Sequence, residues 1–271
     1  MIRVAVTGAA GRMGREVVRA VLEAEGLELA AAIDTHEVGV DAGTLAGTAA
    51  AGIAVGSELD SALARTYPHV LVDFTLPHSV LANLRLALAH GVSPVVGTTG
   101  LSAESLAEVD RTAREKGIGA FVAPNFAIGA VLMMQFAAQA AKYLPDVEII
   151  ELHHDRKVDS PSGTALLTAQ KIGEARRAAA VSPVAEPGGL VEKAPGARGA
   201  RAGITGDVPI HSVRLPGFVA HQEVIFGGVG QVLTLRHDSI DRRSFMPGVI
   251  LAVRKVRGLK GLVVGLENLL E

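Results

Sequence analysis

The first half of the chain alternates short apolar runs with segments whose apolar residues recur at helical spacing. The apolar runs predict strands at residues 2–8, 27–34, 70–75, 93–99 and 119–125. Helical patterns are found at residues 14–26, 58–65, 78–90 and 102–116. Alternating strands and helices are typical of a parallel, doubly wound sheet, and continuously apolar strands fit burial on both faces.

The pattern changes after Asn125. Helices are expected at 125–144 and 162–177, with a strand at 146–154 between them. Short runs with glycine-bearing links then follow, and their close succession favours an antiparallel sheet. These runs occupy residues 208–214, 220–227 and 231–238, and a last helical pattern occupies 244–256.

These patterns predict an α/β chain in two parts. The first is a doubly wound parallel sheet over residues 1–124, to which the C-terminal residues 239–271 return. The second, residues 125–238, is an α+β domain with a mostly antiparallel sheet. Residues 182–203 are rich in Gly, Pro and Arg and are expected to form a long loop, either a flap, an arm of an oligomer or a solvated linker.

Composition excludes several classes of protein. An apolar fraction of 49% with 20% charged residues is that of a globular protein rather than a disordered one. The net charge of -2 provides no general attraction for nucleic acid or an anionic membrane, and no apolar run has membrane-spanning length. The absence of cysteine excludes disulfides and thiolate chemistry. The N-terminus lacks the pattern of a signal peptide, so we expect a cytoplasmic protein.

Three glycines, Gly8, Gly11 and Gly14, lie where the first strand meets the first helix, in VTGAAGRMGREVV. A turn without Cβ atoms lets the backbone approach a pyrophosphate, and a helix N-terminus supplies N–H groups to it. The spacing is G-x-x-G-x-x-G rather than the strict dinucleotide fingerprint. A tight strand-to-helix turn without a ligand is the alternative interpretation.

The surroundings of this turn favour a dinucleotide site. Asp34 ends the second strand, where an acidic side chain can bind ribose hydroxyls. Later strands end in small polar residues, such as Thr75, Thr98 and Asn125, at the sheet edge where ligands bind. Asp34 favours the free 2′-hydroxyl of NAD, whereas Arg12 could pair with the 2′-phosphate of NADP, so we expect both NADH and NADPH to be used.

The stretch ELHHDRKVDSPSGTA, residues 151–165, carries the second candidate site. Adjacent histidines on a strand point to opposite faces, so His153 and His154 do not readily bind one metal ion. A hydrolase with Ser160 or Ser162 as nucleophile is an alternative, but neither serine stands in the G-x-S-x-G sequence of a nucleophile elbow. A solvated charged turn would explain the cations but not the sequence SPSGTA.

That sequence is typical of a helix N-terminus. Ser162 is a candidate N-cap, and Gly163 and Thr164 would then present backbone N–H groups to an anion. Arg156 and Lys157 precede it. We infer a small carboxylated ligand that is protonated during hydride transfer, with His or Lys as the proton donor.

These motifs resemble the dihydrodipicolinate reductase (4-hydroxy-tetrahydrodipicolinate reductase) family over essentially the whole chain. The most diagnostic run is His-His-x-x-Lys-x-Asp-x-Pro-Ser-Gly-Thr-Ala. The other segments that carry the resemblance are VAVTGAAGRMGREV, VVGTTG, VAPNFAIGAVLM, HSVRLPGFVAHQEVIFG and RHDSIDRRSFMPGV.

The resemblance implies a Rossmann-like nucleotide domain and a second domain that binds substrate and builds a homotetramer. It implies that His153 is the acid/base, that Lys157 is the proton donor, and that the substrate carboxylates are held by His154, Ser162, Gly163 and Thr164. The expected nucleotide contacts are Gly8, Ala9, Ala10, Gly11, Arg12, Met13, Asp34, Phe74, Thr75, Gly97, Thr98, Thr99, Ala123, Pro124, Asn125 and Phe126. Leu76 stands where some members carry an arginine, which weakens any preference for NADP.

The implied reaction starts from a small cyclic hydroxy dicarboxylate, which loses water and receives a hydride and a proton to give tetrahydrodipicolinate for lysine and diaminopimelate biosynthesis. No metal, nucleic acid or membrane is expected to take part. Two other classes stay open on the residues alone. One is another NAD(P)-linked enzyme of this layout, such as a semialdehyde or homoserine dehydrogenase. The other is a non-catalytic nucleotide-binding regulator.

Overall fold

The chain divides into two compact units in the computed structural model, which describes residues 1–183, 203–205 and 207–270. The first unit comprises Met1–Ile128 and the C-terminal segment that begins at Arg242. The second unit comprises Gly129–Asp241. The sequence analysis placed the corresponding limits at 124/125 and 238/239.

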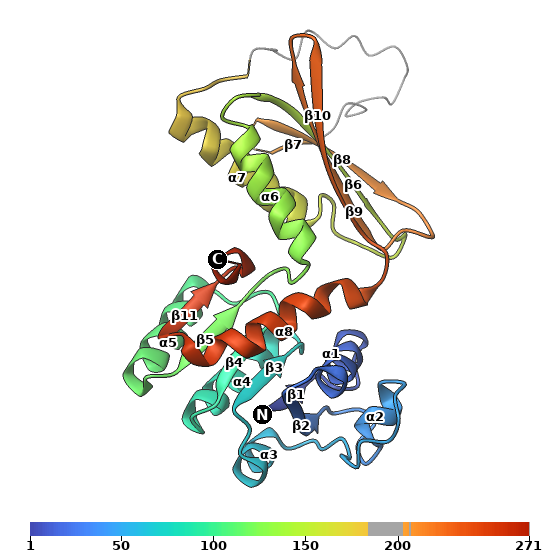
Figure 1. The fold of residues 1–271 in the computed structure, drawn as a ribbon, viewed down its shortest axis with the longest axis vertical. Helices are drawn as coiled ribbons and strands as arrows, with labels where there is room; N and C mark the ends of the chain where they lie inside the picture. Colours follow the sequence, from blue (N-terminus) through green and yellow to red (C-terminus); the bar gives the residue numbers. More distant parts are fainter. Residues whose placement is uncertain (184–202, 206, 271) are drawn as a thin grey trace. The chain divides into compact units, whose positions relative to one another are not determined.

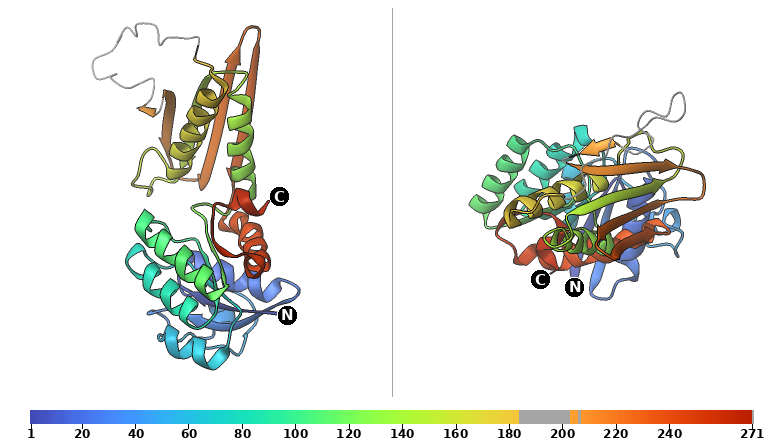
Figure 2. Two further views of the ribbon diagram at one scale, coloured as in Figure 1. Left: turned by 90° about the vertical axis from the view of Figure 1, so that its left-hand side faces the viewer. Right: turned by 90° about the horizontal axis from the view of Figure 1, so that it is seen from above.

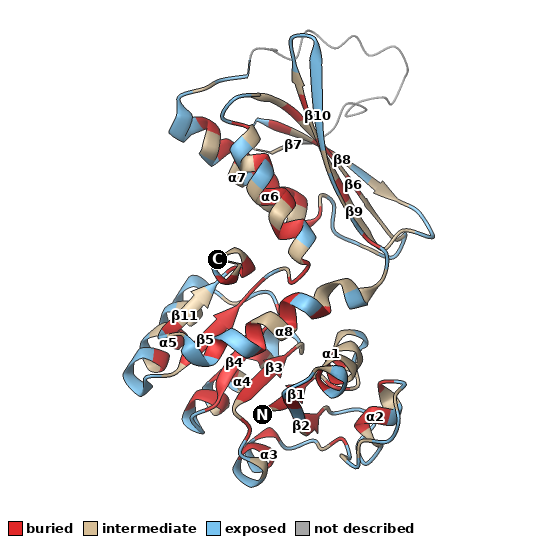
Figure 3. Cartoon of the chain, viewed as in Figure 1, coloured by how far each residue is buried: buried red, intermediate tan, exposed pale blue. Residues whose placement is uncertain are grey.

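The first unit contains a six-stranded sheet in the order β11-β5-β4-β3-β1-β2, in which every pair is parallel (Figure 1). Its strands are β1 (Ile2–Thr7), β2 (Leu27–Ile33), β3 (Val70–Asp73), β4 (Ser93–Val96), β5 (Gly119–Val122) and β11 (Gly261–Val264). Every residue of β3, β4 and β5 is buried, as their apolar sequences predict (Figure 3). The predicted doubly wound parallel sheet is confirmed.

Helices cover both faces of this sheet (Figure 2). They are α1 (Arg12–Glu23), α3 (Leu59–Thr66), α4 (Pro77–Ala89), α5 (Ala103–Lys116) and α8 (Met246–Lys255). The short helix α2 (Ala42–Leu45) packs against α1. Ala5 of β1 packs in one apolar cluster with Leu63 of α3 and Ala87 of α4. Because side chains alternate along a strand, Val4 and Val6 point to the other face, where α1 and α8 contact each other.

The second unit contains a five-stranded sheet in the order β10-β9-β6-β8-β7. Its strands are β6 (Asp146–His153), β7 (Gly203–Thr205), β8 (Val208–Arg214), β9 (Ala220–Gly228) and β10 (Gln231–Ser239). Only the β6–β8 pair is parallel among the strands that the structure describes, so the predicted mostly antiparallel sheet is confirmed.

Two helices, α6 (Ile128–Ala140) and α7 (Gly163–Ala179), accompany this sheet (Figure 1). Along β6 the buried residues alternate with half-buried ones, and Ile149 and Glu151 lie on the buried face. On the neighbouring strand β9, Gln222 lies opposite Glu151, and its side-chain amide donates a hydrogen bond to the hydroxyl of Thr168 on α7. The polar turn between β6 and α7 is therefore positioned by a buried sheet face and a packed helix.

Several elements differ from the prediction. Strand β11 was missed, because a four-residue apolar run has no periodicity that separates strand from helix. The short elements α2 and β7 were also missed. The helix expected at 244–256 begins as a 3₁₀ turn, Arg242–Phe245, and continues as α8. Of the predicted loop at 182–203, residues 184–202 lie outside the described residues. No helix in the described part of the chain is long and apolar enough to cross a membrane.

Candidate active site

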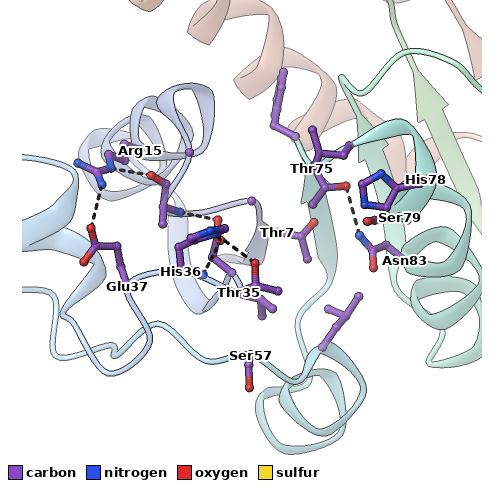
Figure 4. Close-up of a pocket in the computed structure, with 18 residues that line it drawn as sticks. Thr7, Arg15, Thr35, His36, Glu37, Ser57, Thr75, His78, Ser79 and Asn83 are labelled. Atoms are coloured by element: carbon purple, nitrogen blue, oxygen red, sulfur yellow. Dashed lines mark hydrogen bonds and ion pairs between the residues drawn. The ribbon is translucent and has the colours of Figure 1, made fainter.

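A cavity of about 520 Å³ lies at the carboxyl ends of β1, β2 and β3 in the first unit (Figure 4). Six of the sequence-predicted nucleotide contacts line it: Gly8, Ala10, Gly11, Asp34, Phe74 and Thr75. Other lining residues were not predicted, among them Arg15, His36, His78 and Asn83. The cavity therefore lies at the sheet edge where parallel α/β sheets bind ligands.

The glycine turn at this cavity cannot accommodate side chains. Gly8 has a φ of +75°, and a Cβ there would lie 2.6 Å from the carbonyl oxygen of Phe74. A Cβ on Gly14 would lie 1.9 Å from the carbonyl oxygen of Gly8. Gly11 is the N-cap of α1 and offers no side chain to cap it. Gly8 and Gly14 are therefore required by the tight packing of the turn itself, and the start of α1 supplies the N–H groups that suit a pyrophosphate.

Asp34 connects the glycine turn to the end of β2. Its carboxylate accepts hydrogen bonds from the backbone N–H groups of Ala10 (3.0 Å) and His36 (2.9 Å). The guanidinium of Arg15 donates to the Ala10 carbonyl at 2.8 Å and forms an ion pair with Glu37 at 3.7 Å (Figure 4). The cation in the lining is thus Arg15, whereas the predicted Arg12 is exposed and not among the lining residues.

A buried carboxylate, Asp73, organises the opposite side of the cavity. It ends β3, is 1% exposed, and among the described residues its hydrogen-bond donors are hydroxyls, an amide and a backbone N–H. The donors are the hydroxyls of Thr7 (3.0 Å), Thr75 (2.8 Å) and Thr98 (2.9 Å), the Thr75 N–H (3.0 Å) and the Asn83 amide (2.7 Å). Asp73 therefore ties the ends of β1, β3 and β4 together.

The remaining predicted nucleotide contacts do not line the cavity. They are Ala9, Arg12, Met13, Gly97, Thr98, Thr99, Ala123, Pro124, Asn125 and Phe126. Those after Val96 and Val122 follow β4 and β5, at the same edge of the parallel sheet. Phe126 is buried, with its ring centroid 5.7 Å from that of Phe74. A Cβ on Gly97 would lie 2.1 Å from the Phe74 ring.

In the second unit, the stretch from β6 to α7 forms the predicted helix N-terminus. Ser162 is the N-cap of α7, and its hydroxyl accepts the Ala165 N–H at 3.2 Å, which confirms the sequence prediction. Gly163 and Thr164 begin the helix. A helix end with this geometry binds anions, because its first N–H groups and dipole point outward.

His153, the last residue of β6, is oriented by a carboxylate that the sequence analysis missed. Its Nδ1 forms a hydrogen bond with Glu151, whose side chain is completely buried. Burial alone would raise the pKa of Glu151, but hydrogen bonds from His153, Arg214 and Ser212 outweigh it and lower the pKa to about 2. An ionised carboxylate only accepts hydrogen bonds, so Nδ1 carries a proton and proton exchange at His153 occurs at Nε2.

Lys157 lies on the turn that follows. Its ammonium contacts both oxygens of Asp159 at 2.7 and 2.8 Å and lowers the pKa of that carboxyl. Its backbone N–H donates to the carbonyl of His154 at 3.2 Å. Arg214 donates to the carbonyl of Asp159 at 2.7 Å and to both oxygens of Glu151. His153 and the Lys157 turn are thereby joined through Glu151 and Arg214.

Sequence reasoning missed Glu151, Arg214, Asp73 and Arg15. A signal existed for Glu151, because Glu-x-His on a strand places both side chains on one face. Arg214 is 63 residues away along the chain and carried no local signal. Within the described part of the chain, no group of three or more His, Asp or Glu residues is arranged to hold a metal ion.

Comparisons with known proteins agree over both units. A family model described as dihydrodipicolinate reductase, N-terminus, matches residues 2–126, and one described as dihydrodipicolinate reductase, C-terminus, matches residues 129–270. The chain is 54% identical to 4-hydroxy-tetrahydrodipicolinate reductase of Moorella thermoacetica, over 100% of this chain and 98% of the relative. It is 53% identical to the Desulfitobacterium hafniense enzyme of that name, over 100% and 99%.

A solved structure is also similar over the full length. It is dipicolinate-bound dihydrodipicolinate reductase from Paenisporosarcina sp. TG-14, with a TM-score of 0.84 and 47% sequence identity. The match covers 100% of each chain.

Proposed function

The chain belongs to the dihydrodipicolinate reductase family, and from that membership we propose which of its residues carry out the family's reaction. It is an NAD(P)H-dependent oxidoreductase that reduces 4-hydroxy-tetrahydrodipicolinate to tetrahydrodipicolinate in lysine and diaminopimelate biosynthesis. The substrate loses water and takes up one hydride and one proton. The protein must therefore bind a cyclic dicarboxylate and deliver a proton.

The single observation that carries the proposal is the stretch from β6 to α7. One short segment combines an oriented imidazole, an ammonium and a capped helix N-terminus. The imidazole of His153 has Nε2 available for proton exchange because Glu151 engages Nδ1. An anion site beside two proton-bearing side chains suits a carboxylated substrate that is protonated in the reaction.

We assign the substrate contacts within this segment. The N–H groups of Gly163 and Thr164 bind a carboxylate at the N-terminus of α7, and Ser162 holds that helix end in place. His154 contributes a further contact to the dicarboxylate. Lys157 exchanges its partner from Asp159 to the substrate, which its partly exposed side chain permits, and donates the proton. His153 acts as acid/base.

The first unit is assigned to the cofactor. When bound, a reduced nicotinamide dinucleotide supplies the hydride. The N-terminus of α1, which has no side-chain cap and lies at the cavity beside the tight turn at Gly8 and Gly11, fits its pyrophosphate. Asp34 suits the ribose hydroxyls. The other predicted contacts, after β4 and β5, are assigned to the same ligand.

We expect both NADH and NADPH to serve. Asp34 favours NADH, whereas Arg15, which lines the same cavity, and Arg12 of the glycine loop favour the 2′-phosphate of NADPH. Two features weaken the preference for NADPH. Arg15 already forms an ion pair with Glu37, and Leu76 stands where some family members carry an arginine. The ratio of the two rates measures the balance between Asp34 and the arginines.

We also propose that the protein is a cytoplasmic homotetramer. This rests on the family resemblance and on apolar side chains of β10, Val232 and Leu233, which are 70% and 38% exposed in the single chain. Sedimentation of the purified protein tests it: a monomer at micromolar concentration would contradict the proposal.

The experiment that tests the reaction follows the absorbance of reduced nicotinamide. Substrate is made in situ by condensing pyruvate with aspartate semialdehyde, and NADH and NADPH are compared in parallel. Rapid oxidation that depends on the condensation product is expected with both. Oxidation with neither, in protein that binds nucleotide, would contradict the proposed function.

A further inference from the structure

The second unit contains an ion pair between a completely buried carboxylate and a largely buried guanidinium, outside the residues that the family resemblance assigns to the reaction. Glu151 lies on the buried face of β6 and has no exposed surface, and Arg214 ends the neighbouring strand β8. The two Nη atoms of Arg214 lie 2.9 Å and 2.7 Å from Oε2 and Oε1 of Glu151. This is the two-point geometry in which arginine holds a carboxylate most firmly.

We propose that the Glu151–Arg214 pair is the positioning element of the active site, which holds the proton-donating groups and the carboxylate-binding helix end in one arrangement. The inference rests on the proposed function and extends it to residues that do not touch the substrate. Each of the three functional parts is connected to this pair by a separate hydrogen bond.

The first connection fixes the imidazole. Oε2 of Glu151 accepts from Nδ1 of His153, so the ring has one tautomer and presents Nε2. Hydrogen bonds from His153, Arg214 and Ser212 lower the pKa of Glu151 and keep the carboxylate ionised despite its burial. Without that negative charge, the imidazole could bind with either nitrogen protonated.

The second connection fixes the helix end. Oε1 of Glu151 accepts the backbone N–H of Ser162 at 3.3 Å. Ser162 is the residue whose hydroxyl caps α7. The carboxylate that orients His153 thus also sets where the N–H groups of Gly163 and Thr164 lie.

The third connection reaches the Lys157 turn. Arg214 donates to the carbonyl of Asp159 at 2.7 Å, and the Asp159 carboxylate holds the Lys157 ammonium. Arg214 also donates to the carbonyl of Val213 at 2.8 Å, which restricts its own guanidinium. One guanidinium therefore joins β6, β8 and the turn that carries the proposed proton donor.

Stability alone is a weak reason for such a pair. Removing two charges from water is costly, and well-packed apolar residues of similar volume often stabilise a protein as well or better. A second Glu–His pair of the same sheet, Glu148 with His211, has a different environment from Glu151 with His153. Glu148 accepts from His211 at 2.8 Å, but both of these side chains are about one-third exposed, whereas the Glu151 side chain is completely buried.

The test compares Glu151→Gln with the matched control Glu148→Gln. A glutamine at 151 has one acceptor oxygen, for which His153, Arg214 and Ser162 compete. Nitrogen-15 NMR of the histidine rings, with His153 assigned by its absence in His153→Gln, reports the tautomer independently of any turnover. We expect a single Nδ1–H tautomer in the unmodified enzyme and in Glu148→Gln, and a mixture or the Nε2–H tautomer in Glu151→Gln.

Kinetics provide the second readout. We expect Glu151→Gln to lower kcat by roughly 10²–10⁴-fold, as loss of a carboxylate that orients a catalytic imidazole does elsewhere. The KM for NADH should stay unchanged, and Glu148→Gln should retain normal turnover. Arg214→Lys keeps the charge but cannot reach Glu151 and the Asp159 carbonyl together, so it should lower kcat and weaken binding of dipicolinate, a stable cyclic dicarboxylate.

The outcomes separate this inference from the function it rests on. If the unmodified enzyme oxidises no cofactor, the proposed function fails, while the NMR comparison still decides the role of Glu151. An unchanged tautomer with normal kcat in Glu151→Gln would overturn the inference. If Glu151→Gln does not fold, Arg214→Lys decides, and normal kcat with normal dipicolinate affinity in that variant would overturn it too.

Discussion

Lys157 and Asp159 form an ion pair at the edge of the proposed substrate site. The ammonium is about one-fifth exposed, and both carboxylate oxygens lie within 2.8 Å of it. Exposed pairs of this kind contribute little to stability, because water competes for both partners. A dicarboxylate substrate offers the ammonium an equivalent partner, so Lys157 is held near its working position at little energetic cost.

Removing this ammonium should affect the chemistry far more than the fold. We expect Lys157→Ala to lower kcat by ~10²–10⁴-fold, the range for loss of a general acid. Steady-state rates of nicotinamide oxidation measure it. Lys142→Ala is the control, because Lys142 is an exposed lysine of the same unit that contacts only Gln139 among the described residues. Near-normal turnover in Lys157→Ala would exclude it as the proton donor.

At the residue scale, sequence reasoning identified the groups that contact ligands better than those that orient them. His153, Lys157 and Ser162 stand in one short segment whose residue types already indicate acid/base chemistry and a helix cap. Glu151 was part of the same segment but was counted only as a strand residue. Arg214 could not be found, because its bonds to Glu151 join strands that are distant in sequence and leave no local pattern. Asp73 was missed although it bonds to nearby Thr75, because it was counted only as a residue of an apolar strand.

At the scale of elements, the first turn of α7 has two roles. Its N-cap stabilises the helix, and its backbone N–H groups form the proposed carboxylate site. Its N-cap, Ser162, is buried, and its N–H bonds to Glu151. Helix α5 begins with an equivalent cap, in which Ser102 accepts the Ser105 N–H at 3.2 Å. The two caps have the same chemistry, but only the first adjoins the proposed carboxylate site.

The two caps therefore make a matched pair of substitutions. Ser162→Ala and Ser102→Ala should each lower the free energy of unfolding by about 1 kcal/mol, the usual loss for a serine N-cap. Denaturant titration measures this. Only Ser162→Ala should also weaken dipicolinate binding in calorimetry. Equal dipicolinate affinity in both variants would show that the start of α7 does not bind the carboxylate.

Strand β3 has a comparable role in the first unit, through Asp73 at its end. Asp73→Asn replaces one acceptor oxygen by a donor that faces the Thr7 hydroxyl and the Asn83 amide. We expect a loss of about 1–3 kcal/mol in stability, as for other unsatisfied buried polar groups, together with weaker nucleotide binding. Unfolding and NADH fluorescence titration measure the two effects, with exposed Asp60→Asn as control. Unchanged NADH affinity would remove Asp73 from the support of the cofactor site.

The type of an element, helix or strand, was predictable where its apolar pattern was long or repeated. The first and last residues of each element were less predictable. Apolar runs in the sequence predicted strands β1 to β5 of the parallel sheet. They also predicted β6, β8, β9 and β10 of the second sheet. Residues 97–99 and 123–125 were predicted as strand but form loops, since β4 ends at Val96 and β5 at Val122. Gly97 and Ala123 still donate backbone hydrogen bonds to Asp73 and Val96 of the neighbouring strands, and the chain turns away from the sheet after them. Where this strand pairing stops is a tertiary effect that no local propensity contains.

For the whole molecule, the chain leaves the first unit after Ile128 and returns to it at Arg242. The return is completed by β11, which pairs with β5 at the sheet edge. The assignment of one unit to the cofactor and the other to the substrate stays a proposal. Its physical basis is the separation of the glycine turn and Asp34 from the acid/base stretch into different compact units.

Glu151 should make the stability of the enzyme depend on pH. Its pKa falls from 4.5 to about 2 on folding, so its ionised form stabilises the folded state above pH 4.5. That stabilisation is lost as the pH falls towards 2. The difference corresponds to about 3 kcal/mol as an upper estimate. Denaturant unfolding of the unmodified enzyme and Glu151→Gln should differ most near pH 7 and converge near pH 2. A gap that does not depend on pH would contradict this origin.

The most direct test of the central claim is isotope transfer from cofactor to product. The enzyme is given NADH that carries deuterium at both hydrogen positions of the nicotinamide C4, together with substrate made in situ, and the product is analysed by mass spectrometry. Direct hydride transfer predicts one deuterium in the tetrahydrodipicolinate formed. Product without deuterium, or cofactor consumed without this product, would contradict the assignment of the chain as a nicotinamide-dependent reductase of this substrate.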